Sequence, residues 1–402
     1  MTLIKPFRAV RPAPEKAKMV SSVPYDVIYE SEARDFIKEN PYSFLRVTRP
    51  EAEESDCESV EHARDNFEMF LNENILAKDT QESYFVYRLS TDDHSQTGIV
   101  ACCSLDDYEG GLIKPHEKTR PDKVEDRTRH MVGLRAQTGL IFLAHRPIDV
   151  LKKICAKVAA GEPLYDFECA TGVRHTVWRC DETLEITDAF AAIPALYVAD
   201  GHHRLESAEQ ARKRLQAENQ SHDGTEEYNF VMAGLFPADE LQILAYNRTV
   251  SDLNGLSRDQ LLDGIKQNFI VTEVDSCTPL THGEICMYFE GQWFDLRFAV
   301  EYFREPDPIE RLDVTILQKY LLEPVLGIVD PRTDERIGFV GGGRGTSELT
   351  KLVDSGEARI AFSLYPTTMD DLFAVSDMGE IMPPKSTWFE PKLKDGLFVH
   401  LI

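Results

Sequence analysis

Five consecutive residues near the middle of the chain combine an acid, a glycine, two imidazoles and a guanidinium: Asp200, Gly201, His202, His203 and Arg204. They follow an apolar run and precede a charge-rich amphipathic segment, which predicts a turn from a strand into a helix. Glycine allows a tight turn and a close approach to a ligand, and a helix N-terminus presents N–H groups and a positive dipole end. Arg204 adds a forked donor that suits phosphate or carboxylate. The pattern predicts a site for a small anion.

Asp200 allows several roles at this turn. Its carboxylate could orient a histidine, hold a substrate hydroxyl or help to bind a metal ion. The simpler alternative is that Asp200 caps the helix and that the histidines only pack. Because an aspartate, two histidines and an arginine converge on one turn, we favour the functional interpretation.

A second group lies in the glycine- and proline-flanked loop "PHEKT" and in the "PDKVEDRTRH" that follows it. His116 and Glu117 stand in this loop, where Glu117 could act as a general base or as a metal ligand. Arg127 and His130 are three residues apart on the next predicted helix and share a face. A solvated charged loop explains the composition equally well, and no H-E-x-x-H metalloprotease signature is present.

Three weaker signals complete the set of candidate residues. Asp26 follows a Pro-Tyr turn in "SSVPYDVI", and Lys385 in "MPPKSTWFEPK" could contact phosphate unless its segment only packs aromatic side chains. The segment "GFVGGGRGTSE" nearly matches a phosphate-binding loop. Arg344 and Gly345 stand where lysine and serine or threonine are required, so we predict a flexible surface turn.

The elements that must position these residues follow from hydrophobic periodicity. We predict strands at 83–89, 97–105, 140–146 and 192–199, and helices at 31–40 (capped by Ser31), 58–76, 128–139, 149–161 and from about Leu205. Segment 40–50 is predicted as a turn followed by a strand, and 228–236 and 241–250 as a strand pair. Further on, we predict helices at 257–269 and 313–327, a hairpin at 283–300 with Gly291 in its turn, and a strand, glycine turn and helix at 336–356.

The length of 402 residues indicates two or three domains. We place them at 1–150 (with the PHEKT loop), at 151–255 (with the central turn) and at 256–402 (a C-terminal α+β domain). The expected fold class is α+β, in the sense of mixed α/β. The net charge of −25 argues against general nucleic-acid binding, although a local basic pocket could still hold a small anion.

The sequence also indicates the cellular compartment of the protein. It shows no signal-peptide core and no apolar run of about 18 residues, so we expect a cytoplasmic protein without a membrane span. Eight cysteines form no C-x-x-C pair. We expect them to be free thiols, mostly buried, and expect no zinc or iron–sulfur site.

Four blocks carry a resemblance along essentially the whole chain: "PYDVI", "PHEKT...EDR", "ADGHHR" and "MPPKSTWFEPKLKDGL". Together they resemble the microbial family called "domain of unknown function ten-fifteen". The segment "ILAYNRTV" departs from the "LPTHR"-like sequence of that family, which leaves Tyr246 and Asn247 without an assigned role.

A second, local resemblance joins "DGHHRLESAEQAR" to the Gly-x-x-Arg turn of the ParB and sulfiredoxin superfamily, where this turn grips nucleotide phosphates. The superfamily includes kinases of free serine, which carry a similar turn and use an acidic residue as base. The resemblance implies a ParB/sulfiredoxin-like nucleotide-binding core with an additional C-terminal α+β domain.

The leading hypothesis is a nucleotide-dependent phosphotransferase that acts on a small hydroxylated metabolite, with conversion of free L-serine to O-phosphoserine, or the reverse, as the best guess. ATP or ADP, or another phosphate donor, would act with Mg²⁺. The candidate catalytic residues are Glu117, Asp26, Asp200 and His202, with Glu117 or Asp26 as base and Asp200 orienting a histidine or assisting Mg²⁺. The candidate phosphate contacts are Gly201, His202, His203, Arg204, His116, Arg127 and Lys385. Replacing Arg204 with alanine is expected to abolish transfer and to leave the fold intact.

Two alternatives stay open. A metal-dependent hydrolase would use His116, Glu117, Asp200, His202 and His203 as an N/O ligand set. A non-enzymatic nucleotide-binding regulator would use the same phosphate site without turnover. The sequence does not fix the oligomeric state.

Overall fold

A computed structural model describes residues 4–53, 59–181, 183–298 and 307–402, and the chain divides into two compact units. Unit 1 comprises the chain up to residue 115, 119–241 and 391–402, and unit 2 comprises 116–118 and 242–390. The expected boundaries near 150 and 255 do not coincide with this division. Residue 150 lies in a helix, and the strands before and after this helix belong to one sheet. Both sides of position 150 are therefore part of unit 1. Within the described ranges, no helix is long and apolar enough to cross a membrane.

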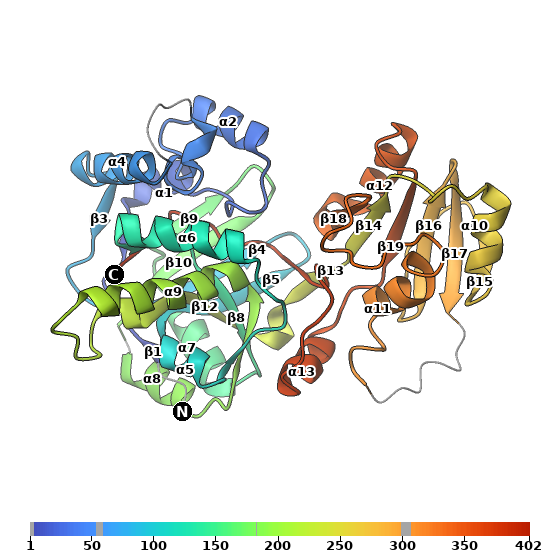
Figure 1. The fold of residues 1–402 in the computed structure, drawn as a ribbon. Coiled ribbons are helices and arrows are strands. Elements are labelled where there is room, and N and C mark those ends of the chain that lie inside the picture. Colours follow the sequence, from blue (N-terminus) through green and yellow to red (C-terminus); the bar gives the residue numbers. More distant parts are fainter. Residues whose placement is uncertain (1–3, 54–58, 182, 299–306) are drawn as a thin grey trace. The chain divides into compact units, whose positions relative to one another are not determined.

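A mixed nine-stranded sheet forms the centre of unit 1 (Figure 1). Strand β8 runs parallel to β12 and antiparallel to β11, and β12 is antiparallel to β5. In spatial order the strands are β6 (Ile113–Lys114), β11 (Leu196–Asp200), β8 (Ile141–His145), β12 (Phe230–Pro237), β5 (Ser95–Ser104), β4 (Tyr84–Ser90), β10 (Arg174–Cys180) and β9 (Tyr165–Glu168), with β1 (Ile4–Lys5) paired to β5.

Helices cover one face of this sheet: α6 (Pro121–Leu134), α7 (Asp149–Ala159), α8 (Thr183–Ala191) and α9 (His202–Glu218). Alternate residues of the strands, such as Ile99 and Leu235, join Leu151 of α7 and Leu205 of α9 in one apolar core. α6 and α9 lie side by side (Figure 1), and Ser207 Oγ donates to Val124 O at 3.0 Å between them. The amphipathic pattern predicted for this segment is confirmed, because Leu205, Ala208, Ala211 and Leu215 lie on one buried face of α9.

The C-terminal segment 391–402 returns to unit 1 after the chain has built unit 2. Phe398 packs on the other face of the sheet, with its ring centroid 5.0 Å from that of Phe85 and 6.2 Å from that of Tyr87. Beyond it, β21 (His400–Leu401) pairs with β7 (Ala136–Gln137). The last residues of the chain therefore complete the first unit.

Smaller elements precede and connect the sheet strands. They are β2 (Val10–Pro12), η1 (Pro14–Lys16), α1 (Ala17–Val20), α2 (Glu30–Glu39), α3 (Leu45–Thr48), η2 (Pro50–Ala52), α4 (Ser59–Asn72), β3 (Leu76–Lys78), α5 (Leu105–Glu109), η3 (Glu227–Asn229) and η4 (Ala238–Glu240).

Two sequence predictions in this region are wrong. The helix α2 is preceded by Tyr29 as its N-cap instead of Ser31, because the Glu32 carboxylate accepts the Tyr29 N–H at 2.9 Å. The strand predicted within 40–50 is instead the helix α3, where Phe44 and Val47 lie buried at helical spacing in a cluster with residues of α4.

Unit 2 is built on a six-stranded antiparallel sheet. Its strand order is β15 (Phe269–Val274), β17 (Gln292–Phe298), β16 (Glu284–Phe289), β19 (Ile360–Leu364), β14 (Tyr246–Val250) and β18 (Ile337–Gly341). Its other elements are β13 (Gln242–Leu244) paired with β20 (Trp388–Glu390), α10 (Arg258–Ile265), α11 (Asp313–Leu317), η6 (Gln318–Leu322), η7 (Gly342–Arg344), α12 (Gly345–Asp354) and α13 (Met369–Asp377).

The hairpin with Gly291 in its turn is confirmed by the pairing of β16 and β17. The predicted pair formed by 228–236 and 241–250 is wrong, because β12 pairs in unit 1 whereas β14 pairs with β18 and β19 in unit 2. Both units mix helices with sheets, so the mixed α/β fold class is confirmed.

The cysteines follow the prediction only in part. Cys102, Cys103, Cys155 and Cys180 are buried free thiols, and Cys169 is a partly exposed one. Cys277 and Cys286 form a disulfide, which corrects the expectation of free thiols at these two positions. The correction has a geometric reason, since the loop before β16 brings their Cα atoms to 5.7 Å. Cys57 lies outside the described residues.

Candidate functional site

The predicted strand-to-helix turn is present in unit 1. β11 ends at Asp200, and Gly201 adopts φ 91° and ψ 29° as the N-cap of α9. The helix begins at His202, earlier than Leu205, because the Leu205 N–H already donates to Gly201 O at 2.9 Å. The N-cap position of α9 is occupied by Gly201 and not by Asp200.

Gly201 is required here for two reasons. A positive φ of this size is disfavoured for residues with a side chain. In addition, a Cβ at this position would lie 3.2 Å from Arg204 Nε and 3.4 Å from the Cα of Ile141. The glycine therefore lets the arginine fold back against the turn.

The guanidinium of Arg204 points into unit 1 and not toward solvent. Its Nη1 donates to Leu140 O at 2.5 Å and lies 3.9 Å from Asp395 Oδ1, and its Nη2 lies 3.4 Å from Asp200 Oδ2. Burial acts to lower the pKa of Arg204, but the carboxylates of Asp26, Asp200 and Asp395 outweigh it and raise this pKa. Nε is buried and has no hydrogen-bond partner within the part of the chain that the structure describes.

Asp395 is the residue of this site that the sequence reasoning missed. Only 2% of its surface is exposed, and its backbone exchanges hydrogen bonds with Ser22 at 3.0 Å. Burial raises the pKa of Asp395 to about 7, with Asp26 and Asp200 acting in the same direction and Arg204 opposing them. A carboxyl group that titrates near neutral pH can accept or return a proton during a reaction.

Arg127 and His130 reach the same place from α6. They line a cavity of about 20 Å³ together with Tyr25, Arg204 and Asp395, which is room for about one water molecule. The Arg127 guanidinium lies 4.5 Å from the centroid of the Tyr25 ring and donates to Thr48 O at 3.0 Å. His130 is 2.8 Å from Val47 O, and burial lowers its pKa to about 4.

The remaining residues of the turn are also held in place. His203 Nε2 accepts the Arg120 N–H at 3.0 Å, which ties the start of α9 to the start of α6. His202 is buried, and Lys392 Nζ lies 3.6 Å from Asp200 Oδ2. In the described ranges, no group of three or more His, Cys, Asp or Glu side chains could hold a metal ion. Asp200 Oδ2 thus lies near two cations, Arg204 and Lys392.

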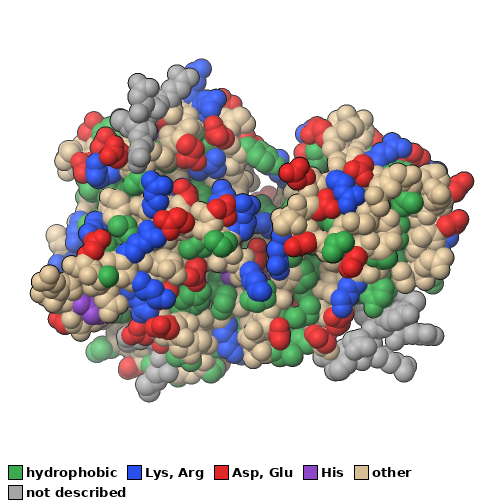
Figure 2. Space-filling model, viewed as in Figure 1, with side chains coloured by type: hydrophobic (Ala, Val, Ile, Leu, Met, Phe, Trp, Pro, Cys, Tyr) green, Lys and Arg blue, Asp and Glu red, His purple; other side chains and the backbone are tan. Residues whose placement is uncertain are grey.

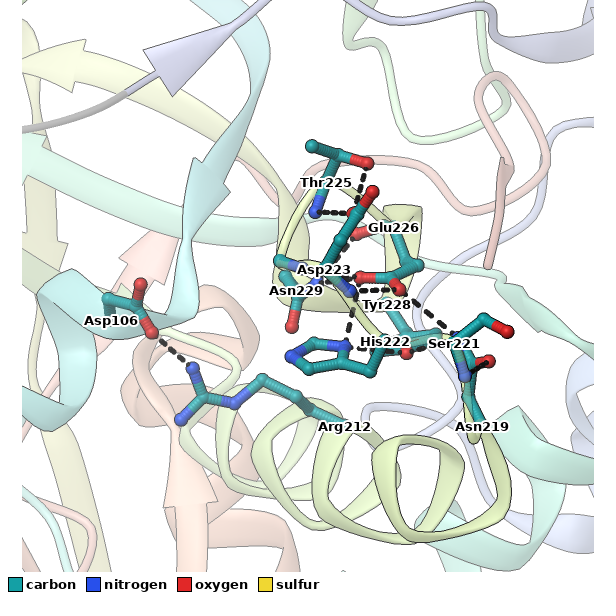
Figure 3. A network of polar contacts seen from close by, with 11 residues as sticks. Asp106, Arg212, Asn219, Ser221, His222, Asp223, Thr225, Glu226, Tyr228 and Asn229 are labelled. Atoms are coloured by element: carbon teal, nitrogen blue, oxygen red, sulfur yellow. Dashed lines mark hydrogen bonds and ion pairs between the residues drawn. The ribbon is translucent and has the colours of Figure 1, made fainter.

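A polar network fixes the rest of α9. Figure 3 shows Arg212 of α9 reaching Asp106 of α5, with Nη1 to Oδ1 at 2.6 Å. Beyond the helix, the Glu226 carboxylate accepts the N–H groups of Asp223 and Gly224 in the loop that follows (Figure 3). Arg212 therefore joins α9 to α5, and the loop after the helix is closed by its own hydrogen bonds.

The structure places His116 and Glu117 of the PHEKT loop in unit 2. His116 Nε2 lies 3.1 Å from Thr387 Oγ1, and His116 O accepts the Met382 N–H at 2.8 Å. The loop therefore contacts the segment that also carries Lys385.

Arg248 of β14 is another buried arginine, and the sequence reasoning missed it too. Its Nη2 donates to Pro384 O and Lys385 O, both at 3.0 Å, and its Nη1 donates to Tyr246 O at 2.6 Å. Burial lowers the pKa of Arg248 to about 10, partly opposed by Tyr246 and Glu117. The signal for Arg248 was present in "ILAYNRTV", where a single arginine interrupts an otherwise uncharged strand.

Comparison with known proteins identifies the family. Residues 4–315 match the family described as "Protein of unknown function (DUF1015)". The chain belongs to this family. No curated protein matches the sequence. The first two blocks and the central turn lie within the matched residues, and the block with Lys385 and Asp395 lies beyond them.

Several solved structures are similar in part. A free serine kinase in complex with AMP has 14% identity, covers 77% of this chain and 94% of its own, and gives a TM-score of 0.36. SbnI with a C-terminal truncation, from Staphylococcus aureus, has 12% identity over 75% and 87%, with a TM-score of 0.40. A conserved hypothetical protein from Pyrococcus furiosus has 13% identity over 76% and 95%, with a TM-score of 0.36.

Proposed function

We propose that this DUF1015 protein is a nucleotide-dependent phosphotransferase that acts on a small hydroxylated metabolite, with free L-serine as the first acceptor to test. One observation carries the proposal. The buried carboxyl group of Asp395, with a pKa of about 7, lies beside the glycine-started N-terminus of α9. A proton acceptor next to an anion-binding helix terminus is what transfer of a phosphoryl group to a hydroxyl requires.

In the proposed reaction, the acceptor hydroxyl gives its proton to Asp395 while its oxygen bonds to the transferred phosphorus. The bond from that phosphorus to the donor breaks, and its electron pair leaves with the nucleotide. The N-terminus of α9 holds phosphate oxygens, and the unpartnered Arg204 Nε–H faces the same turn. Asp26 and Asp200 help to keep the pKa of Asp395 high.

The remaining predicted residues also have proposed roles, and those of His202, His203 and Arg127 differ from the phosphate contacts predicted from the sequence. Asp26 and Glu117 are the alternative bases, His202 and His203 shape the turn, and His116 and Lys385 are proposed as phosphate contacts. Arg127 positions Tyr25 through the stacking described above. Mg²⁺ supplies charge neutralisation when it is bound to a nucleotide. Because the described side chains form no metal-binding group, no step of the reaction is assigned to the ion.

Asp395→Asn tests the proposal directly. Transfer to L-serine and to other small alcohols is followed by ³¹P NMR with ATP, ADP or pyrophosphate as donor. We expect Asp395→Asn to lower the turnover rate by about 10²- to 10⁴-fold and to remove an inflection near pH 7 from the rate profile. Asp65→Asn, at an exposed position of α4, is the matched control and is expected to keep full activity.

Three outcomes would change the assignment. Full activity of Asp395→Asn together with loss in Glu117→Gln or Asp26→Asn would move the base to that residue. Stabilisation by nucleotides without turnover on any acceptor would favour the regulator. Stoichiometric zinc or manganese in the purified protein would favour a metal-dependent hydrolase.

A further inference from the structure

A cavity of about 120 Å³ lies in unit 1 between α7 and the sheet. Leu140, which accepts the Arg204 hydrogen bond, directly precedes β8, and His145, which lines the cavity, ends this strand. At 3.3 Å per residue, the two ends of β8 are about 13 Å apart. The cavity is therefore separate from the Arg204 site.

The wall of the cavity is mostly apolar. Ile99 of β5, Leu151 and Cys155 of α7 and Leu235 of β12 line it, and all four belong to the core of unit 1. His145 adds a ring whose Nδ1 lies 2.9 Å from Arg146 O, so this nitrogen must be the donor. Burial lowers the pKa of His145, which keeps the imidazole neutral at physiological pH. The deep part of the cavity thus suits an uncharged group.

Thr97 forms hydrogen bonds with two side chains of opposite charge at this cavity. Its Oγ1 accepts a hydrogen bond from Arg88 Nε at 3.1 Å, and its backbone N–H donates to Glu240 Oε2 at 2.8 Å. Both charged residues line the cavity, and no ion pair joins them to each other in the described part of the chain. Thr97 therefore positions the Arg88 guanidinium and the Glu240 carboxylate, although these two groups form no ion pair with each other in the described residues.

The groups that face a ligand are the outer atoms of these two side chains. The Arg88 guanidinium lies 5.1 Å from the centroid of the Trp178 ring, which fixes its plane. Its Nη1 and Nη2 have no hydrogen-bond partner among the described residues, and the same holds for Glu240 Oε1. Lys152, also at the cavity, forms an ion pair with Asp239. The unpaired charges at the cavity are therefore one guanidinium and one carboxylate.

We propose that this cavity binds a free α-amino acid with a small aliphatic side chain. The ligand's carboxylate lies on Arg88 Nη1 and Nη2, its ammonium on Glu240 Oε1, and its side chain enters the apolar part. Arginine presents two parallel donors that match a carboxylate. An apolar cavity of 150 Å³ admits benzene, so a somewhat smaller one fits a side chain of the size of valine. This site is independent of the proposed phosphotransfer.

Titration calorimetry with the full-length protein tests the site through ligand analogues. L-Valine is compared with 3-methylbutanoate, which lacks the ammonium group, and with 2-methylpropylamine, which lacks the carboxylate. We expect L-valine to bind and each analogue to bind at least about 10-fold more weakly, because each loses one charge-assisted contact. The proposal is overturned if L-valine does not bind at millimolar concentration, or if 3-methylbutanoate binds equally well.

Variants locate the binding independently. Arg88→Gln and Glu240→Gln are each expected to weaken L-valine binding at least about 10-fold. Arg174→Gln changes an exposed arginine on β10 and serves as the matched control, with unchanged affinity expected. Circular dichroism confirms that each variant is folded. If folded Arg88→Gln and Glu240→Gln bind L-valine as the unmodified protein does, the assignment to this cavity is wrong.

Discussion

Arg204 in unit 1 and Arg248 in unit 2 are both buried, with 5% and 4% of their surfaces exposed, yet their charges are balanced by different groups. The negative charges of three carboxylates stabilise the charged form of Arg204. The hydrogen bonds of Arg248, in contrast, all go to backbone carbonyls. The pKa of Arg204 is raised and that of Arg248 is lowered to about 10. Carbonyl dipoles satisfy the hydrogen bonds of Arg248 but carry no net countercharge, so its charge is balanced less completely than that of Arg204.

The largest expected effect follows from removing the paired arginine. Arg204→Met leaves Leu140 O and the clustered carboxylates without their cation, which we expect to destabilise unit 1 by about 3–5 kcal/mol. Hydrogen exchange of unit 1 peptides measures this loss. Arg214→Met removes an exposed ion pair on the same helix and should leave the protection almost unchanged. Equal protection in Arg204→Met and Arg214→Met would contradict the charge balance described for Arg204.

This burial also revises the expectation that an alanine at position 204 leaves the fold intact. The guanidinium lies in the interior of unit 1, so its loss affects stability as well as chemistry. Arg204→Lys keeps the charge and is the better variant for separating the two effects.

The second prediction concerns pH. The pKa of Asp395 is raised to about 7 in the folded protein, against about 3.9 in an unfolded chain, so folding favours the protonated carboxyl. Below about pH 4 both states are protonated, and the cost of ionising the buried group appears as the pH rises from 4 to 7. Asp395→Asn removes this cost. Its melting temperature should therefore exceed that of the unmodified protein by more at pH 8 than at pH 5.

The pKa of His130 is lowered to about 4, so this group makes the stability rise with pH in the acidic range, opposite to Asp395. Because both proteins contain such groups, their effects on the melting temperature cancel in the comparison. Melting curves of the two proteins that run parallel from pH 5 to pH 8 would show that Asp395 keeps an ordinary pKa.

The third prediction concerns Arg248 of unit 2, whose loss is compared with that of Arg204. Arg248→Met leaves carbonyl groups unsatisfied and removes the cation from one carboxylate, Glu117, instead of three, so we expect a cost of only about 1–3 kcal/mol. Arg258→Met, at a partly exposed arginine of α10, is the control, and urea unfolding measures the cost of each change. A cost for Arg248→Met as large as that for Arg204→Met would contradict the difference in charge balance.

The smallest effect compares two glycines. Gly201→Ala combines a positive φ with crowding at Arg204 Nε, whereas Gly356, at φ 83° after α12, has open space around it. We expect Gly356→Ala to cost about 1 kcal/mol and Gly201→Ala about 1 kcal/mol more, measured by urea unfolding. Equal costs would mean that Arg204 moves aside without penalty.

Local patterns in the sequence predicted the elements better than the site. The strand, glycine and amphipathic helix around Gly201 follow from neighbouring residues, and the buried face with Leu205 and Ala208 was correct. The direction of the Arg204 side chain was not predictable, because Leu140 and Asp395 reach it from distant parts of the chain. No local pattern distinguishes a buried aspartate that titrates near neutral pH from an ordinary exposed one.

The glycine-rich segment in unit 2 shows the same limit. It was predicted as a flexible surface turn, but a Cβ on Gly341 would lie 2.7 Å from the Trp388 ring, and one on Gly342 would lie 2.5 Å from Ala245 O. These glycines are required by packing with β20 and with the chain before β14, which pattern matching along the chain does not reveal.

Surface charge was informative only about classes of partner. The net charge of −25 predicts no general affinity for nucleic acid, and Figure 2 shows basic side chains interspersed with acidic ones over the visible part of unit 1. The buried cations that matter for the proposed chemistry contribute little to such a view.

The return of residues 391–402 to unit 1 has a consequence for synthesis on the ribosome. Asp395 and Phe398 emerge only after the roughly 150 residues of unit 2 have been translated, which takes about 8–30 s at typical rates. During that interval a nascent unit 1 has its turn and its arginine but neither the proton acceptor nor the aromatic side chain that packs on its sheet. The proposed activity therefore requires residues that are translated after the whole of unit 2.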